Sequence, residues 1–298
     1  MRVGFIGIGN MGWPMARNLV TKGFQVTVFD AEPGRSQRFT QECGGAVAGQ
    51  LTDLAANDVI VTMLPTGQIV CQVLTGGGDN SLARSLKPGT VVIEMSSSEP
   101  TGTQQLGAQL AHRQVTLIDA PVSGGVPRAQ SGKLAIMIGG DDGAAIERVK
   151  PVLSAMGDRL FMTGPLGSGH AMKALNNYIA AACFTATAEA ILVGEKFGLD
   201  PEKMVDIVNV STGRNFHTDV VMKEHVLSKK FATGFSVGLL AKDVKIASDL
   251  ATAVGIDAPL SKLIVERWAS ARDRLGANRD NTEAILAWSS GASSHSRT

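Results

Sequence analysis

The sequence has few cysteines and almost no net charge. Cys43, Cys71 and Cys183 are widely spaced and belong to no C-x-x-C or Cys/His pattern. This argues against a disulfide framework and a zinc site, and it favours a reducing cytoplasm. The net charge of +1 offers no electrostatic basis for binding nucleic acid or an anionic membrane. We therefore expect small molecules and further copies of the chain as partners.

Long uninterrupted apolar runs are also missing. The apolar stretch from Tyr178 to Val193 contains two threonines and Glu189, and it is too short to cross a bilayer. The apolar start of the chain is interrupted by Gly4 and Gly7, which fits a first strand better than a signal peptide. We expect a buried helix in the first case and no membrane span in either.

A glycine-rich run follows the first apolar segment. The run Gly7-Ile8-Gly9-Asn10-Met11-Gly12 stands between a strand-like segment and a helix-like one. In such a turn Gly7 permits the sharp change of direction, Gly9 lets the backbone approach a pyrophosphate, and Gly12 allows close helix packing. The N–H groups at the start of the helix then face the phosphates. The run predicts a dinucleotide site.

An acidic residue ends the second strand-like segment. Asp30 lies 18 residues after Gly12, where folds of this kind place the carboxylate that binds an adenosine ribose. A carboxylate there repels a 2′-phosphate, so NAD is favoured over NADP. Arg35 and Arg38 follow closely and leave two alternatives open, namely solvated surface side chains or a clamp for the 2′-phosphate.

The chain is long enough for two domains. Strand-like and helix-like segments alternate up to Thr163, which is typical of a Rossmann-type, doubly wound parallel sheet. Alanine-rich, helix-favouring stretches follow. We predict a dinucleotide-binding domain over 1–163 and an all-helical substrate and oligomerisation domain over 164–298. The second domain should begin with a long interdomain helix over about 169–197.

Three later segments carry candidate chemistry. Ser123-Gly124-Gly125 follows a strand end and offers a hydroxyl and backbone N–H groups to a substrate carboxylate, although an ordinary Gly-Gly turn also explains its glycines. Lys173 and Asn177 share one face of the long apolar helix. The helix dipole and burial both disfavour an ammonium there, which favours a general base; a snorkelling surface lysine is the alternative. Lys242-Asp243 either takes part in the chemistry of the site or forms a surface ion pair.

The histidines form no recognisable catalytic or metal-binding motif. No pair has the carboxylate-linked i to i+4 spacing of a metal helix, and no G-x-S-x-G elbow is present. We therefore expect no metal site, and we interpret His170 and the other histidines as bystanders.

Together these motifs resemble the β-hydroxyacid dehydrogenase family. The resemblance covers Met1 to about Trp288 and rests on four motifs in order. They are the glycine run, Asp119 to Gly125, Gly167 to Asn177, and Lys242-Asp243.

The resemblance implies a role for each motif. Lys173 is the catalytic lysine that takes the hydroxyl proton as hydride leaves the carbinol carbon. Asn177 hydrogen-bonds the reacting oxygen, with Asn176 as the second candidate, and Ser123 to Gly125 hold the carboxylate. Lys242 lies beside substrate and nicotinamide, next to its adjacent acid Asp243. Further cofactor contacts are implied for Met63, Leu64 and Pro65, and for Ser96 and Ser97.

One position departs from the family pattern near these cofactor contacts. Glu94 stands where relatives usually carry aspartate. The departure does not touch the proton or hydride chemistry.

The resulting hypothesis is an NAD-preferring oxidoreductase, with NADP possible. It transfers hydride between the cofactor and the hydroxyl carbon of a small 3-hydroxy acid, of the 3-hydroxyisobutyrate, glycerate or serine/threonine type, with a lysine as acid and base. A semialdehyde reductase that uses NADP and a non-catalytic dinucleotide-binding scaffold are the alternatives. A cytoplasmic homodimer or homotetramer is expected. The substrate, the direction and the number of subunits stay open.

Overall fold

The computed structural model describes residues 1–78 and 81–289 and divides into two compact units. The first unit is Met1–Lys173, and the second begins at Ala174. The last part of the predicted second domain, residues 290–298, lies outside the described residues.

Unit 1 is built on a mostly parallel sheet with the order β3-β2-β1-β4-β5-β6-β8-β7, and β9 pairs with β8. Strand β8 runs antiparallel to β6 and β7 and parallel to β9. The strands are β1 (Arg2–Ile6), β2 (Gln25–Phe29), β3 (Ala46–Val47), β4 (Val59–Thr62), β5 (Val91–Glu94), β6 (Thr116–Asp119), β7 (Val122–Ser123), β8 (Leu134–Gly139) and β9 (Gly157–Gly164).

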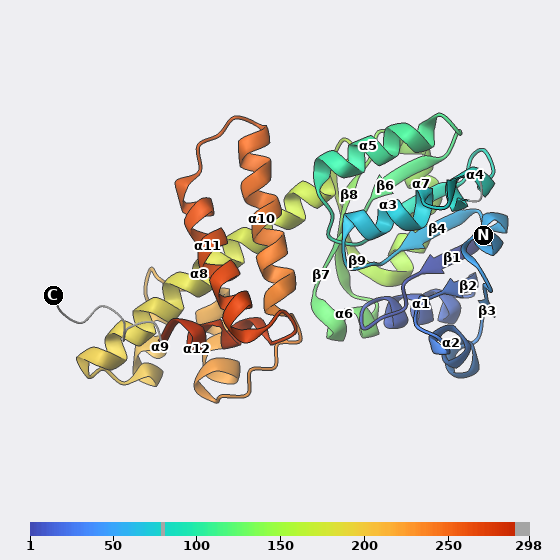
Figure 1. Ribbon diagram of the computed structural model, residues 1–298. Helices are drawn as coiled ribbons and strands as arrows, with labels where there is room; N and C mark the ends of the chain where they lie inside the picture. The colour runs from blue at the N-terminus through green and yellow to red at the C-terminus, as the bar shows by residue number, and fades with distance from the viewer. Residues whose placement is uncertain (79–80, 290–298) are drawn as a thin grey trace. The chain divides into compact units, whose positions relative to one another are not determined.

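Helices cover both faces of this sheet (Figure 1). Successive strand residues point to opposite faces, so Val59 and Val61 belong to one core while Ile60 belongs to the other. The first core lies under α1 (Gly12–Thr21), α2 (Arg35–Cys43), α6 (Gly125–Ser131) and α7 (Gly143–Met156). The second lies under the 3-10 helix η1 (Leu51–Ala56), α3 (Gly67–Thr75), α4 (Leu82–Ser85) and α5 (Pro100–Ala111).

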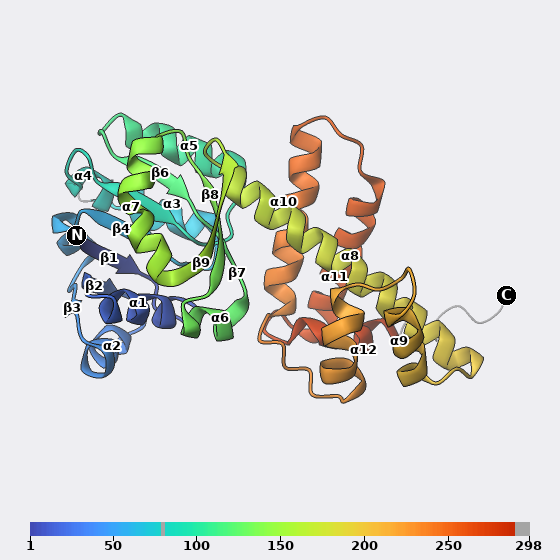
Figure 2. The ribbon, with the colours of Figure 1, turned by 180° about the vertical axis from the view of Figure 1, so that it is seen from behind.

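Unit 2 is helical (Figure 2). Its core contains Phe184, Trp268 and Trp288 in mutual ring contact, and the Trp268 indole N–H donates to the Thr185 hydroxyl at 3.1 Å. The elements are the greater part of α8 (Ser168–Phe197), then α9 (Pro201–Asn209), the π-helix η3 (His217–Leu227), α10 (Val237–Ala253), α11 (Pro259–Leu275), the 3-10 helix η4 (Asn281–Glu283) and α12 (Ala284–Ser289). The sheet and these helices confirm the predicted fold class.

Helix α8 contributes residues to both compact units. Its first residues, up to Lys173, belong to unit 1, so the compact units divide later than the 163/164 boundary predicted from the sequence. The reason is that carboxylates at strand ends bind the first turn of the helix. The helix is also long and apolar enough to cross a membrane by length and composition, a test that core helices of soluble proteins pass too.

Candidate functional site

The glycine run forms the turn between β1 and α1, and its three glycines have different surroundings. A Cβ on Gly7, whose φ is +90°, would lie 2.4 Å from the Met63 carbonyl oxygen, and one on Gly12 would lie 1.9 Å from the Gly7 carbonyl oxygen. A Cβ on Gly9 would have nothing within 4 Å. The fold therefore requires Gly7 and Gly12, whereas Gly9 leaves open the backbone approach that a pyrophosphate needs. This arrangement fits a dinucleotide.

Asp30 follows β2 and binds the glycine turn. Its Oδ2 accepts the Ile8 N–H at 2.9 Å, and its Oδ1 accepts the Glu32 N–H at 2.9 Å. The Arg35 guanidinium lies 3.0 Å from Oδ1 and also contacts Glu32. The Arg38 guanidinium lies over the Trp13 ring, 4.9 Å from its centre. Arg35 is thus held by two carboxylates, and Arg38 by an aromatic ring.

The predicted cofactor segments after β4 and β5 are hydrogen-bonded to each other. The Leu64 N–H donates to the Ser96 hydroxyl at 2.9 Å, and the Ser96 N–H donates to Oε1 of Glu94 at 2.8 Å. The Met63 N–H donates to the Ile6 carbonyl at 2.9 Å, next to the glycine turn. Because the carboxyl ends of parallel strands meet at one edge, unit 1 brings these segments together with the glycine turn.

Ser123, Gly124 and Gly125 join β7 to α6. Ser123 is the last residue of β7, opposite Ala135, and its side chain is half-buried. Gly124 and Gly125 are exposed and have φ values of +128° and +64°. The backbone conformation explains both glycines, as an ordinary Gly-Gly turn would, and the Ser123 hydroxyl is the polar side-chain group of this segment.

Asn177 and Asp243 form a buried polar pair in unit 2. Asn177 is 7% exposed and donates from Nδ2 to Oδ2 of Asp243 at 2.6 Å, while its own Oδ1 accepts from Asn176 at 3.1 Å. The Lys242 ammonium lies 3.2 Å from Oδ1 of Asp243, whose residue exposure is 2%. Lys242 and Asp243 therefore form a largely buried ion pair rather than a surface one.

Lys173 is half-buried on α8, four residues before Asn177. Residues at this spacing lie on the same side of a helix, one turn apart. Lys173 and Asn177 therefore lie on the same face of one continuous helix, as the sequence predicts.

Glu94 was absent from the predicted site, and His170 was expected to be a bystander. Each residue is 1% exposed, and the His170 Nε2 atom lies 2.6 Å from Oε2 of Glu94. Burial acts to raise the pKa of the Glu94 carboxyl, but His170 and Ser96 outweigh it and hold this pKa below its ordinary value. Glu94 is thus an ionised carboxylate inside the protein. The one sequence feature that pointed to Glu94 is that relatives usually carry aspartate at this position.

Asp119, at the end of β6, binds the start of α8. Its Oδ1 accepts the Gly167 N–H at 2.7 Å, and its Oδ2 accepts the His170 N–H at 2.8 Å. It thereby satisfies backbone donors that the first turn of a helix leaves without intrahelical partners. Asp119 lay within a recognised motif, but its role as a helix anchor was not anticipated.

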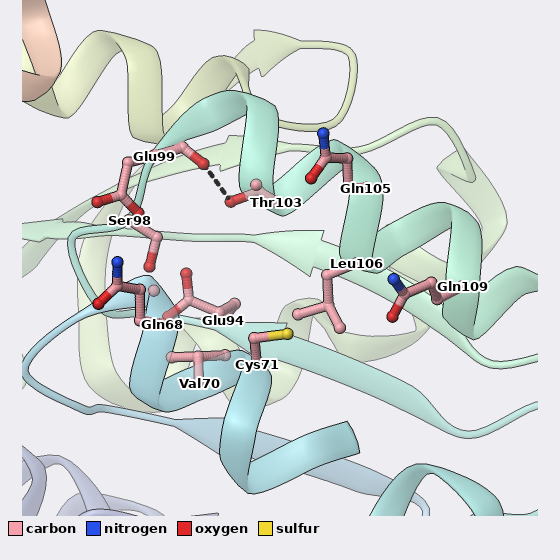
Figure 3. A pocket seen from close by; sticks show the side chains of 12 residues that line it. Gln68, Val70, Cys71, Glu94, Ser98, Glu99, Thr103, Gln105, Leu106 and Gln109 are labelled. Atoms are coloured by element: carbon pink, nitrogen blue, oxygen red, sulfur yellow. Dashed lines mark hydrogen bonds between the residues drawn. The ribbon is translucent and has the colours of Figure 1, made fainter. Parts of the chain in front are cut away.

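A pocket of about 160 Å³ opens between α3 and α5 (Figure 3). Its wall includes Glu94 and Thr103, together with Gln68 and Cys71, and contains none of the predicted site residues. Within residues 1–78 and 81–289, no group of three or more His, Cys, Asp or Glu side chains is placed to hold a metal ion.

Two family models match the chain. The NAD binding domain of 6-phosphogluconate dehydrogenase matches residues 2–164. A model described as NAD-binding of NADP-dependent 3-hydroxyisobutyrate dehydrogenase matches residues 167–288. Together the two models extend over both compact units and support a nicotinamide cofactor.

Two similar proteins are dehydrogenases, and each alignment covers nearly the full length of both chains. The 2-(hydroxymethyl)glutarate dehydrogenase of Eubacterium barkeri is 33% identical over 286 residues, which cover 96% of this chain and 94% of that protein. The NAD-dependent L-serine dehydrogenase of Pseudomonas aeruginosa is 33% identical over 285 residues, which cover 94% and 95%. The names of both relatives are consistent with a small hydroxy acid substrate.

A solved structure has the same fold. The structure of Mycobacterium tuberculosis 3-hydroxyisobutyrate dehydrogenase with L-serine aligns with a TM-score of 0.85 at 32% sequence identity. The alignment covers 96% of this chain and 98% of that one. The likeness therefore extends over both the sheet unit and the helical unit.

Proposed function

Because the chain belongs to the β-hydroxyacid dehydrogenase family, we propose that Lys173 is the acid and base of its hydride-transfer reaction. Family membership confirms the predicted resemblance, the oxidoreductase class and the nicotinamide cofactor, either NAD or NADP. The observation that supports the role of Lys173 is the polar set of Asn176, Asn177, Lys242 and Asp243, which begins within one turn of it on α8. Asn177 and Asp243 of this set are buried.

The proposed chemical step oxidises a small 3-hydroxy acid. The neutral amine of Lys173 removes the hydroxyl proton, and the resulting ammonium returns a proton in the reverse reaction. A bound nicotinamide supplies the hydride acceptor. Asn177 donates one amide N–H to Asp243, and its second N–H is available to bind the reacting oxygen. Asp243 therefore orients the amide that orients the substrate.

In this proposal the substrate carboxylate and the cofactor are bound largely by different residues. Ser123, Gly124 and Gly125 hold the substrate carboxylate, supported by the half-buried hydroxyl and the exposed glycines. Asn176 and Lys242 complete the substrate contacts. The cofactor contacts comprise Gly7 to Gly12, Asp30, Met63, Leu64, Pro65, Ser96, Ser97, Lys242 and Asp243.

NAD is the proposed cofactor. A carboxylate such as Asp30 accepts hydrogen bonds from ribose hydroxyls and repels a 2′-phosphate. Arg35 already lies against Asp30 and Glu32, so recruiting it to a 2′-phosphate would require breaking two ion pairs. An NADP-dependent semialdehyde reductase is the second candidate, since Arg35 and Arg38 both follow β2 closely.

The first experiment measures initial rates at 340 nm with NAD and with NADP. The panel contains 3-hydroxyisobutyrate, glycerate, serine, threonine stereoisomers, threonate and 4-hydroxybutyrate, together with the matching semialdehydes. We expect turnover of a 3-hydroxy acid with a lower KM for NAD. Turnover of semialdehydes with NADP alone would establish the second candidate, and NAD binding without turnover would support a non-catalytic scaffold.

We also propose that the chain is a cytoplasmic homodimer or homotetramer. Large apolar side chains are exposed on the helical unit, among them Val193, Phe197, Ile207 and Val210, with exposures between 63% and 87%. Exposed apolar groups of this size on helices commonly mark contacts with another protein. Light scattering coupled to size exclusion should give a mass of at least twice that of the chain, and Phe197→Glu should lower it.

A further inference from the structure

We propose that Glu94 and His170 are positioning residues that fix the start of α8, and with it Lys173, relative to the strand-end loops that hold the cofactor. The proposal rests on the proposed function, because it assigns to Lys173 the proton transfer described above. It assigns the pair no contact with substrate or cofactor.

On its strand side, the pair is continuous with the segments expected to bind the cofactor. One oxygen of Glu94 accepts the Ser96 N–H at 2.8 Å, and Ser96 in turn accepts the Leu64 N–H at 2.9 Å. The other oxygen lies 2.6 Å from the His170 ring. A single buried side chain thus touches both the loop after β5 and the first turn of α8.

On its helix side, the His170 ring is held at both nitrogens. Nε2 faces Glu94 at 2.6 Å, and Nδ1 lies 2.9 Å from the Thr103 hydroxyl of α5. Thr103 and Glu94 line the same pocket in Figure 3. Asp119 binds the backbone of this turn, whereas Glu94 and Thr103 bind a side chain that projects from it. The turn is therefore fixed both along its axis and in rotation.

Rotation of this turn matters because of where Lys173 stands. His170 and Lys173 are three residues apart on α8, so their side chains are neighbours on the helix surface. Any rotation of the turn that released His170 would carry the Lys173 side chain with it. A misplacement of about 1 Å at a reacting group can lower the rate about 100-fold.

The chemistry of the pair favours a positioning role over a purely stabilising one. Placing an ionised carboxylate where it is 1% exposed is costly, and replacing a buried ion pair by apolar side chains is often neutral or stabilising. An apolar pair would pack the same space without fixing a direction. The Glu94–His170 contact does fix one, since the ring must keep Nε2 toward Glu94 and Nδ1 toward Thr103.

The test compares His170→Ala, His170→Gln, Glu94→Gln and the double variant Glu94→Gln/His170→Ala with the parent, in the full-length protein. His170→Ala should lower kcat at least about 10-fold, while KM for the hydroxy acid and Kd for NAD stay within about threefold of the parent values. His170→Gln offers Glu94 an amide N–H in place of the ring Nε2 and should recover most of kcat. The exposed His112→Ala is the matched control and should leave kcat unchanged.

Two outcomes of this set would overturn the proposal. One is a His170→Gln enzyme as slow as His170→Ala, since the amide then fails to replace the ring. The other is a double variant whose loss of kcat equals the product of the losses in the two single variants. Two residues that act as one positioning unit should instead give a double variant little slower than the slower single variant.

A second readout needs no turnover and separates this proposal from the proposed function. Hydrogen exchange of peptides covering residues 168–176 should be about 10-fold faster in His170→Ala than in the parent, and near the parent rate in His170→Gln and His112→Ala. If the parent turns over no hydroxy acid but shows this exchange pattern, the proposed function is wrong and the anchoring of α8 stands. Parent-like exchange in His170→Ala would refute the anchoring.

Discussion

The carboxyl edge of the sheet and the α8–α10 pair hold their functional groups by different means. At the sheet edge the backbone makes many of the contacts, as where Gly12 allows the tight turn and Asp30 accepts two N–H groups. In α8 and α10 the contacts join side chains, from Asn177 to Asp243 and from Asp243 to Lys242.

This difference determines how substitutions in each region affect the protein. A site made of backbone is sensitive to substitution at Gly7 and Gly12, where a single Cβ disrupts the turn and the fold with it. A site made of side chains can be dismantled one group at a time while the helices remain. Substitutions in the two regions should therefore affect folding and turnover in different proportions.

The largest expected effect is at the glycine turn. Gly12→Ala would place a Cβ 1.9 Å from the Gly7 carbonyl oxygen, and we expect the free energy of unfolding to fall by more than about 4 kcal/mol. Circular dichroism and urea denaturation measure this. Gly102→Ala, on the exposed side of α5 with nothing within 4 Å of its Cβ, is the control and should be neutral or stabilising. If Gly12→Ala and Gly102→Ala were equally stable, the tight turn would not depend on the glycine at position 12.

The next effect is on turnover without loss of the fold. Lys173→Ala should lower kcat by about 10²–10⁴-fold, the usual contribution of a general acid or base, while NAD binding measured by calorimetry stays near the parent value. Lys245→Ala, an exposed lysine of α10, serves as the control. An unchanged kcat in Lys173→Ala would show that another group moves the proton.

A smaller effect distinguishes the buried from the exposed carboxylates of α10. Asp243→Asn removes the charge beside Lys242 and should cost about 1–3 kcal/mol of unfolding free energy. Asp249→Asn breaks an exposed ion pair with Lys245, both side chains being more than 60% exposed, and should cost less than about 1 kcal/mol. Urea denaturation of both variants makes the comparison, and similar costs would mean that burial of the Asp243 pair is energetically unimportant.

The smallest effect concerns a carboxylate of unit 2 that is held by backbone and side chains alike. Burial tends to raise the pKa of Asp280, but donors on Thr282, Thr233 and Gly234 outweigh it and lower this pKa below its ordinary value. The resulting stability is present above about pH 3.9, the unfolded value, and is lost as pH falls through the folded value. Between about pH 5 and 3, Asp280→Asn should lose about 2 °C less in Tm than the parent.

The control for this titration is Asp257→Asn, because the Asp257 side chain is 80% exposed. Its Tm should follow the parent across the same pH range. Parallel curves for Asp280→Asn and the parent would show that the Thr233, Thr282 and Gly234 contacts do not persist in solution.

Much of unit 1 could be predicted because its information is local. The glycine spacing, the alternation of strands and helices, and the acidic residue after β2 each follow from neighbours in the sequence. The antiparallel pairing of β8 with β6 and β7 was not predicted, since it depends on which strand edges remain free after the parallel strands assemble.

The polar contacts were harder to predict because they join distant residues. Asn177 and Asp243 are 66 positions apart, and nothing near either residue indicates its partner. Glu94 stood out only as a departure from aspartate, and His170 was interpreted as a bystander. Their pairing depends on how the start of α8 lies across the ends of β5 and β6. The residue types were visible in the sequence, whereas the partnerships required the fold.

The open space at Gly9 carries an evolutionary consequence. Gly7 and Gly12 are demanded by neighbouring backbone atoms, so natural selection for a folded protein alone would preserve them. A Cβ on Gly9 would have nothing within 4 Å beyond its chain neighbours, and selection on folding leaves that position unconstrained. In a descendant that had ceased to bind dinucleotides, mutation would erase Gly9 first, while the two flanking glycines would persist as a record of the ancestral enzyme.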